Sequence, residues 1–293
     1  MATLLGGSRR WALTSSRCGF QWAITAPRLW PVERRISLVA AEFRGFAYEG
    51  AAMAFAVRDA LTGGHRTREL MLGPGRPHIF LTYTGIGLAM GRLPRMLWRD
   101  LVPDLTGSPY YPTMTWLAVD GYGFDRAYRS TRRWVDRQYV PKPYPWQGFP
   151  GYFRRAVDQG IGRALWYLHG AAAARVADAV RRFPEHRRGD LWSGVALSAA
   201  FAGGSDPEGL ALLRKSAGEH RPQLGLGVVF AAKARTVSGF VPPYTGIAAE
   251  ALAGVSVADA VGIAVATAGV PPETGPLPFY EQWRQRIRDR FTD

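Results

Sequence analysis

Short apolar segments with the spacing of one helix face alternate with turn-forming residues along the chain. In 171–183, for example, Val176, Val180 and Phe183 recur on one helical stripe. Proline and glycine clusters such as 73–77 separate the segments and mark turns. We expect helices at 51–57, 59–72, 79–92, 94–101, 116–136 (in two pieces), 153–167, 171–183, 190–202, 224–235, 245–252, 257–267 and 280–290. No apolar run approaches the roughly 20 residues of a membrane-spanning helix, so we expect a soluble all-α protein.

A glycine recurs in the same part of six of these segments. Alignment on these glycines gives steps of 37, 36, 39, 32 and 33 residues by subtraction. The aligned residues are Gly50, Gly87, Gly123, Gly162, Gly194 and Gly227. Two Glu-His-Arg tripeptides, 185–187 and 219–221, lie 34 residues apart by the same subtraction. This period is typical of helix–turn–helix repeats, and it predicts a solenoid-like array of helix pairs with a period of roughly 32–39 residues.

The array divides into two halves, 41–140 and 152–293. They are joined by 141–151, a crossing segment that is rich in proline and aromatic residues and cannot form a helix. Prolines including Pro271 and Pro272 should end the array, and 280–290 should be a capping helix with a charged outer face.

Residues 1–40 form a basic N-terminal arm, and its first 32 residues contain no acid. We favour an irregular arm that packs across the first repeat. The alternative is an amphipathic segment that makes peripheral contact with a membrane or a partner.

The composition indicates which classes of partner the protein could bind, but it does not identify a particular one. The net charge of +14 would attract an acidic protein, a phosphorylated ligand or an anionic membrane. Solvated arginines on helix faces explain the same charge equally well. We do not expect a nucleic-acid partner, because no zinc-finger spacing, RNP-type strand or basic leucine zipper accompanies the short basic runs. Cys18 is the only cysteine, which excludes an intrachain disulfide or a cysteine metal cluster and fits a cytoplasmic protein.

The aligned glycines need a physical reason, since each weakens a helix by about 1 kcal/mol relative to alanine. We favour close packing of neighbouring helices, and space for a ligand is the alternative. Glu49, Asp120 and Asp158 lie near the same ends of three of these helices. They are either helix N-caps, which we favour, or carboxyl groups that converge on a pocket. No dinucleotide fingerprint, Walker loop or metalloprotease motif is present, so we expect neither a cofactor nor a metal.

Several separated strings together resemble a known family. They are Arg-Gly-Phe-Ala-Tyr-Glu-Gly-Ala-Ala-Met (44–53), Gly-Pro-Gly-x-Pro-His (73–78), Leu-x-x-Asp-Gly-Tyr-Gly-Phe (117–124), Asp-Gln-Gly-x-Gly-Arg-x-Leu-Trp (158–166), Asp-Leu-Trp-Ser-Gly (190–194) and Ala-Ala-Lys-Ala-Arg (231–235). The family is a bacterial domain of unknown function that is often encoded in enediyne polyketide gene clusters of actinomycetes. The resemblance implies a role in the maturation of a highly unsaturated polyketide, either free or tethered to an acidic acyl carrier protein. It implies no catalytic residue.

Two functions remain open. The first, which we favour, is a cofactor-independent cyclase, isomerase or lyase that acts on an apolar polyene. Glu49, Asp120 and Asp158 would be catalytic, with burial raising the pKa of one carboxyl while a neighbour stays ionised. The expected ligand-binding residues are His78, Tyr122, Trp166, Trp192, Lys233 and Arg235. The second is a non-catalytic binding or scaffold protein that holds an apolar intermediate or docks an acidic carrier protein.

Overall fold

The computed structural model describes residues 2–269 and 275–292, with side chains from residue 11 onward. Within these ranges the chain is helical and has no strand, so the all-α prediction is confirmed. Pro271 and Pro272 lie outside the described residues. No single helix in the described part of the chain is long and apolar enough to cross a membrane. Helices α12 (Pro243–Ala253) and α13 (Val257–Ala268) meet that test together, but they are bent by 70° relative to each other.

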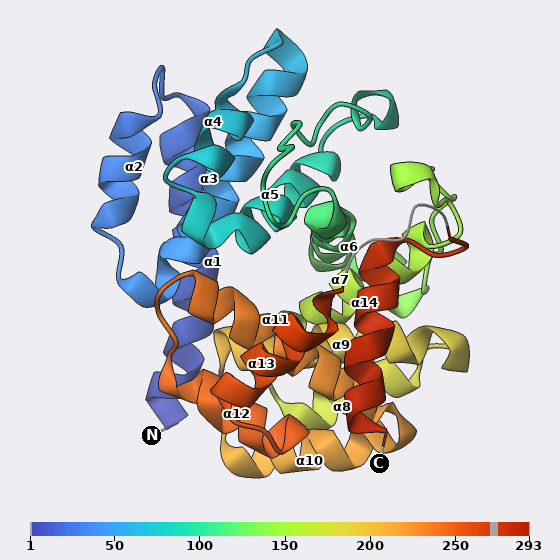
Figure 1. The fold of residues 1–293 in the computed structure, drawn as a ribbon. Coiled ribbons are helices and arrows are strands. Elements are labelled where there is room, and N and C mark those ends of the chain that lie inside the picture. Colours follow the sequence, from blue (N-terminus) through green and yellow to red (C-terminus); the bar gives the residue numbers. More distant parts are fainter. Residues whose placement is uncertain (1, 270–274, 293) are drawn as a thin grey trace.

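Seven helices form the body of the protein, and each packs against the next one in chain order. They are α1 (Ala2–Ile24), α3 (Ala41–Thr62), α5 (Ile79–Met90), α6 (Trp116–Arg129), α7 (Phe153–Leu168), α9 (Glu185–Ala202) and α11 (Arg221–Val237). The series curves around until α11 and α9 return to α3, and Figure 1 shows the resulting ring. Arg235 Nη1 donates to the carbonyl oxygen of Glu42 at 2.8 Å, and the rings of Phe46 and Phe201 meet at 5.4 Å. These contacts close the ring.

Two small residues, two positions apart, let one helix touch both of its neighbours. Positions i and i+2 lie about 200° apart around a helix, so they face opposite sides. In α6, a Cβ atom on Gly121 would overlap with the carbonyl oxygen of Thr84 in α5, and one on Gly123 would overlap with that of Val157 in α7. The close-packing interpretation of the glycines is therefore confirmed.

The same arrangement recurs along the ring. The small residues that face the preceding helix are Gly50, Gly85, Gly121, Gly160, Gly194 and Gly227. Those that face the following helix are Ala52, Gly87, Gly123, Gly162 and Ala196. The sequence alignment is therefore wrong by two residues in three helices, because Gly87, Gly123 and Gly162 belong to the second set. In the corrected register the steps are 35, 36, 39, 34 and 33 residues by subtraction.

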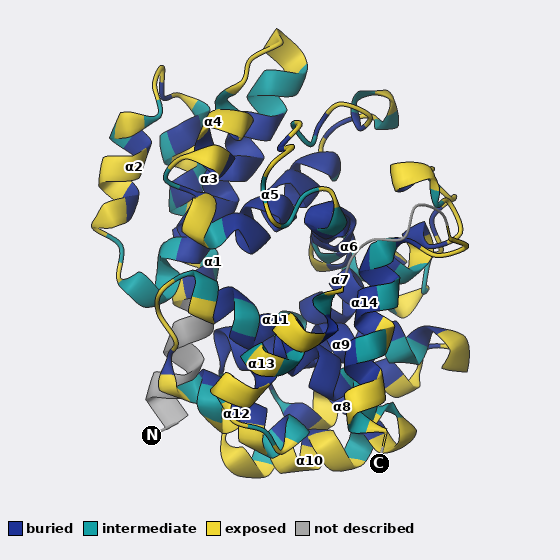
Figure 2. Ribbon diagram, viewed as in Figure 1, coloured by how far each residue is buried: buried dark blue, intermediate teal, exposed yellow. Residues whose placement is uncertain are grey.

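Outer helices accompany the ring unevenly. They are α2 (Trp30–Ser37), α4 (Arg66–Leu72), α8 (Ala173–Arg181), α10 (Pro207–Ala217), α12, α13 and α14 (Phe279–Arg288). The short 3₁₀ turns are η1 (Arg76–His78), η2 (Arg95–Leu97), η3 (Thr113–Thr115), η5 (Trp146–Gly148), η6 (Gly218–His220) and η7 (Asp289–Phe291), and η4 (Arg132–Asp136) is a π-helical turn. Figure 2 shows exposed residues along α2 and α10 and buried ones facing the interior of the ring.

The first half departs from the expected helix pairs. The segment 94–101 contains only the turn η2, and 59–72 is divided between the end of α3 and the short α4. The prediction of a helix at 94–101 is therefore wrong. Prolines at 94 and 103 enclose this segment, and the chain continues as a loop to η3.

Both termini also differ from expectation. The basic arm is not irregular, since α1 is a regular helix that crosses α3 with Gly19 against the Ala47 carbonyl. The prediction that the last helix has a charged outer face is wrong for most of the charged residues of α14. Glu281, Arg284 and Arg288 of α14 are buried against the ring, as the next subsection describes.

Candidate functional site

A pocket with apolar walls lies inside the ring. Its cavity volume is about 40 Å³. Helices α5, α6, α7, α9, α11 and α14 all contribute to its lining. Its larger apolar side chains are Phe80, Leu81, Leu117, Phe201, Phe230 and Trp283. The chain-order packing of the glycine helices thus encloses a small space with apolar walls.

The polar lining residues are Thr84, Arg163 and Lys233. Arg163 is buried and paired with carboxyl groups. Lys233 is half-buried, and across the described ranges it has no hydrogen-bond or ion-pair partner. A primary ammonium in this position is free to bind an anionic group of a ligand.

Behind Thr84 and Arg163 lie two carboxyl groups. Arg163 Nη1 donates to Asp120 Oδ1, and Arg163 Nη2 lies 3.9 Å from Glu49 Oε1. All three side chains are buried. We call Glu49, Thr84, Asp120 and Arg163 the pocket cluster.

The helix register explains why these residues meet. Glu49, Thr84 and Asp120 each directly precede the small residue that faces the preceding helix. Equivalent positions on successive helices point to the same side of the array, and here that side is the interior. Only Glu49 and Asp120 were candidates from the sequence. Thr84 could have been found by its place before Gly85, but only in the corrected register.

The pocket cluster holds more carboxyl groups than cations. Burial raises the pKa of both Glu49 and Asp120, and Arg163 opposes this only in part. The Thr84 hydroxyl donates to Glu49 Oε1 at 2.6 Å, and the Leu81 carbonyl oxygen lies 2.8 Å from the same hydroxyl oxygen. Burial therefore shifts both carboxyl groups toward the protonated form, and Asp120 has the closer contact with Arg163.

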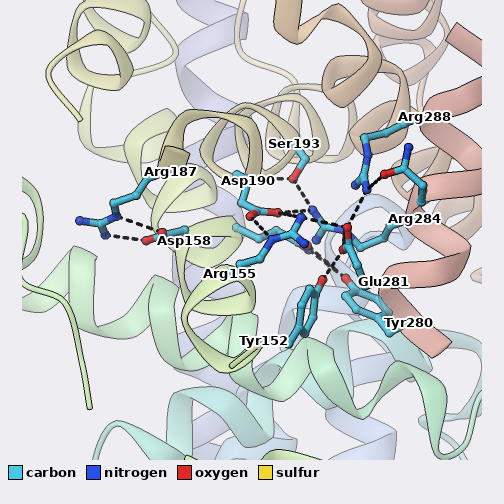
Figure 3. A network of polar contacts seen from close by, with 12 residues as sticks. Tyr152, Arg155, Asp158, Arg187, Asp190, Ser193, Tyr280, Glu281, Arg284 and Arg288 are labelled. Atoms are coloured by element: carbon cyan, nitrogen blue, oxygen red, sulfur yellow. Dashed lines mark hydrogen bonds and ion pairs between the residues drawn. The ribbon is translucent and has the colours of Figure 1, made fainter. Parts of the chain in front are cut away.

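A second buried cluster joins α14 to the ring (Figure 3). Glu281 accepts hydrogen bonds from the Tyr152 hydroxyl at 2.7 Å, from Arg155 Nη2 at 2.9 Å and from Arg288 Nη2 at 2.6 Å. Burial alone would raise the pKa of Glu281. The neighbouring cations, Arg284 first among them, instead lower it to about 2.

The same cluster continues to α9. Arg284 Nη2 donates to Asp190 Oδ1 at 2.7 Å and to Ser193 Oγ at 3.2 Å, and Arg155 Nε donates to Asp190 Oδ2 at 2.9 Å. We call this set the α14 cluster: Tyr152, Arg155, Asp190, Glu281, Arg284 and Arg288. It was missed because a charged helix near the end of a chain is usually solvated, and no local pattern marks it as buried.

The three expected catalytic carboxyls do not all converge. Glu49 and Asp120 share Arg163, whereas Asp158 accepts from Arg187 Nε at 3.0 Å. Figure 3 shows the Asp158–Arg187 pair beside the α14 cluster.

The favoured N-cap interpretation of these acids is wrong. The residues at the caps are Ala40, Thr115 and Tyr152, and the acids lie further inside α3, α6 and α7.

Of the expected ligand-binding residues, Lys233 alone lines the pocket. Trp166 Nε1 donates to the Gly203 carbonyl oxygen at 2.9 Å, and Tyr122 packs edge-on against Trp98. Trp192 is buried in the core.

His78 and Arg235 lie at the contact between α11 and α3 that closes the ring. His78 stacks on Tyr48 at 4.9 Å, and its pKa is lowered to about 4 by burial and by Arg235. Arg235 donates to the carbonyl oxygens of Phe201 and Glu42. Both residues lie where α11 meets α3, so their contacts are those of the closure.

Comparison with known proteins gives one match. A family model described as a protein of unknown function matches residues 14–291 of the chain, from α1 to η7. No curated protein and no solved structure matches the chain.

Proposed function

Because the chain belongs to the DUF1702 family, whose description assigns no activity, we propose a function from the central pocket: the protein binds an apolar molecule that carries an anionic group, and the side chains that line the pocket move apart to admit it. The observation that carries this proposal is Lys233, a cation on the mainly apolar pocket wall that has no partner among the residues the structure describes. Burial of an apolar chain contributes roughly 25 cal/mol per Å². A charge-assisted hydrogen bond to Lys233 then fixes the orientation of the ligand.

The sequence resemblance suggests a ligand class. We propose that the ligand is a polyene of enediyne-type polyketide biosynthesis in an actinomycete cytoplasm, delivered free or by an acidic acyl carrier protein. We also propose that the seven-helix series is a repeat array closed on itself, with its concave side as the binding face.

A second candidate is cofactor-independent proton transfer on the bound molecule, as in an isomerase or a cyclase. It is favoured by the pocket cluster, because Thr84 and Arg163 belong both to the cluster and to the pocket wall. Glu49 would supply a proton through the Thr84 hydroxyl, and the Asp120–Arg163 pair would stabilise charge on the ligand.

Binding can be tested with parinaric acid, a fluorescent conjugated polyene with a carboxylate. We expect saturable binding, and we expect Lys233→Met to weaken it roughly 10- to 100-fold, because a hydrogen bond to a charged group contributes about 1.5–3 kcal/mol. Lys215→Met is the matched control, since Lys215 is an exposed lysine on α10, away from the pocket. Equal affinity of the two variants would contradict the assignment of Lys233.

A test of the proposed proton transfer requires the natural ligand of the protein. Native mass spectrometry of protein from a polyketide-producing host, followed by organic extraction, should give a stoichiometric polyene. Returned to the emptied protein in D₂O, this molecule should take up deuterium with the wild type and not with Glu49→Gln. If the wild type binds the molecule tightly but the molecule takes up no deuterium, the proposed binding function stands and the proposed proton transfer is excluded.

A further inference from the structure

A second concave site lies on the outer surface, where α6 ends and η4 follows. Its lining includes Arg129, Arg132, Arg133, Arg137 and Tyr139, together with the hydroxyl residues 130 and 131. We call these residues the arginine groove. It shares no lining residue with the central pocket.

The cations of the groove are not neutralised by the protein. All four arginines are exposed, and none forms an ion pair with a carboxylate in the part of the chain that the structure describes. Asp136, the carboxylate of this segment, forms no ion pair either within those residues. Some other arginines near the surface are paired, as in Arg66–Glu69 and Arg188–Glu185, whereas Arg34 and Arg35 on α2 form no ion pair in the described part of the chain. Four cations and one carboxylate leave an excess of three positive charges on a short stretch of chain.

The backbone around the groove has an unusual shape that side-chain hydrogen bonds maintain. η4 is a π-helical turn, in which the Arg137 amide donates to the Arg132 carbonyl oxygen at 3.0 Å. Such turns are rare and occur often at functional sites. Gln138, which follows, has a φ of 51°, a conformation that non-glycine residues seldom adopt.

Two contacts hold Gln138 in this conformation. Its side-chain amide donates to the Arg182 carbonyl oxygen at 2.6 Å, and its own carbonyl oxygen accepts from Arg187 Nη1 at 3.0 Å. Arg187 is in turn buried and paired with Asp158. Asp158 therefore supports, through Arg187, the backbone between Arg137 and Tyr139.

Tyr139 orders one of the cations. The Arg133 guanidinium lies over the Tyr139 ring at 3.9 Å, a cation–π contact that leaves its N–H groups available. Guanidinium groups match phosphate oxygens with paired hydrogen bonds and are the preferred side chains for phosphate recognition.

We propose that the arginine groove is a binding site for the phosphate groups of a small phosphate ester. Four arginines that form no ion pair with any described residue line this one concave site, and they fit a multivalent anion such as a diphosphate. Their convergence on a single groove favours a small ligand over an extended polymer, whose backbone would need cations spread along a longer track. The proposal does not depend on the function of the central pocket.

Calorimetric titration of the full chain with inorganic pyrophosphate, at physiological ionic strength, tests the site. We expect saturable binding of one pyrophosphate per chain, tighter than that of inorganic phosphate. Arg133→Gln combined with Arg137→Gln should weaken it at least tenfold. Arg34→Gln combined with Arg35→Gln removes the same charge from exposed positions on α2 and should change it less than twofold.

Three results would overturn the proposal. One is the absence of saturable pyrophosphate binding. Another is an equal loss in the two double variants, which would show attraction to net charge alone. The third is binding to anionic lipid vesicles or to duplex DNA that pyrophosphate does not compete away, which would assign the groove to a membrane or to a nucleic acid.

Discussion

The pocket cluster and the α14 cluster are built from the same side-chain types and have opposite charge balance. The pocket cluster places one arginine between two carboxyls, and the α14 cluster places three arginines around two carboxylates. Both are buried. Burial disfavours the ionised form of the carboxyl groups in both clusters. Only the α14 cluster contains enough arginines to outweigh this effect of burial.

On this difference we base the proposal of a chemical role for one cluster and a structural role for the other. The excess of carboxyls lets burial raise the pKa of Glu49 beside the pocket. The excess of arginines keeps Glu281 ionised and holds α14 against α7 and α9. Buried polar groups therefore identify a candidate site only when their charge balance leaves a proton or a charge to share.

The largest effect should follow from breaking the α14 cluster. Glu281→Gln leaves Arg155, Arg284 and Arg288 without their shared carboxylate in a buried setting. We expect a loss of about 3–5 kcal/mol in the free energy of unfolding, the usual cost of removing one partner from a buried ion pair. Urea denaturation at pH 7 measures it. A loss below about 1 kcal/mol would mean that α14 is held by its apolar residues alone.

Acid should remove the same contribution in the wild type. The pKa of Glu281 in the folded protein, about 2, lies below its ordinary value of 4.5. Its stabilisation is therefore complete above pH 4.5 and is lost as the pH falls toward 2. The difference between these two pKa values corresponds to about 3 kcal/mol. In urea denaturation from pH 6 to pH 2, the gap between the wild type and Glu281→Gln should narrow by this amount. A constant gap would contradict the ionised state of Glu281.

Much of the fold was readable from the sequence, since helical periodicity and turn residues placed most helices within a few residues. The close packing at the glycines also followed from their cost to a helix. The register of the small residues along each helix did not follow from the sequence. Gly85 and Gly87 are equally small, and only the neighbouring helices decide which residue faces which side.

The site was only partly predictable for the same reason. Glu49 and Asp120 stood out as acids in apolar helices. Their partner Arg163 was indistinguishable from the solvated arginines of a strongly basic chain. The burial of Glu281 and Arg284 depends on where α14 docks, which is a long-range contact that no local pattern records.

The smallest effect on stability, and the sharpest test of the comparison, is expected for Glu49→Gln. If Glu49 is protonated, a glutamine replaces a neutral group of similar shape and its amide can still donate to Thr84. The free energy of unfolding at pH 7 should then fall by less than about 1 kcal/mol. Asp120→Asn removes the carboxyl group that contacts buried Arg163 most closely, and it should cost about 3 kcal/mol in the same urea experiment. Equal losses in the two variants would show that both carboxyls are ionised. The pocket cluster would then be a structural ion pair like the α14 cluster, with no proton to give to a ligand.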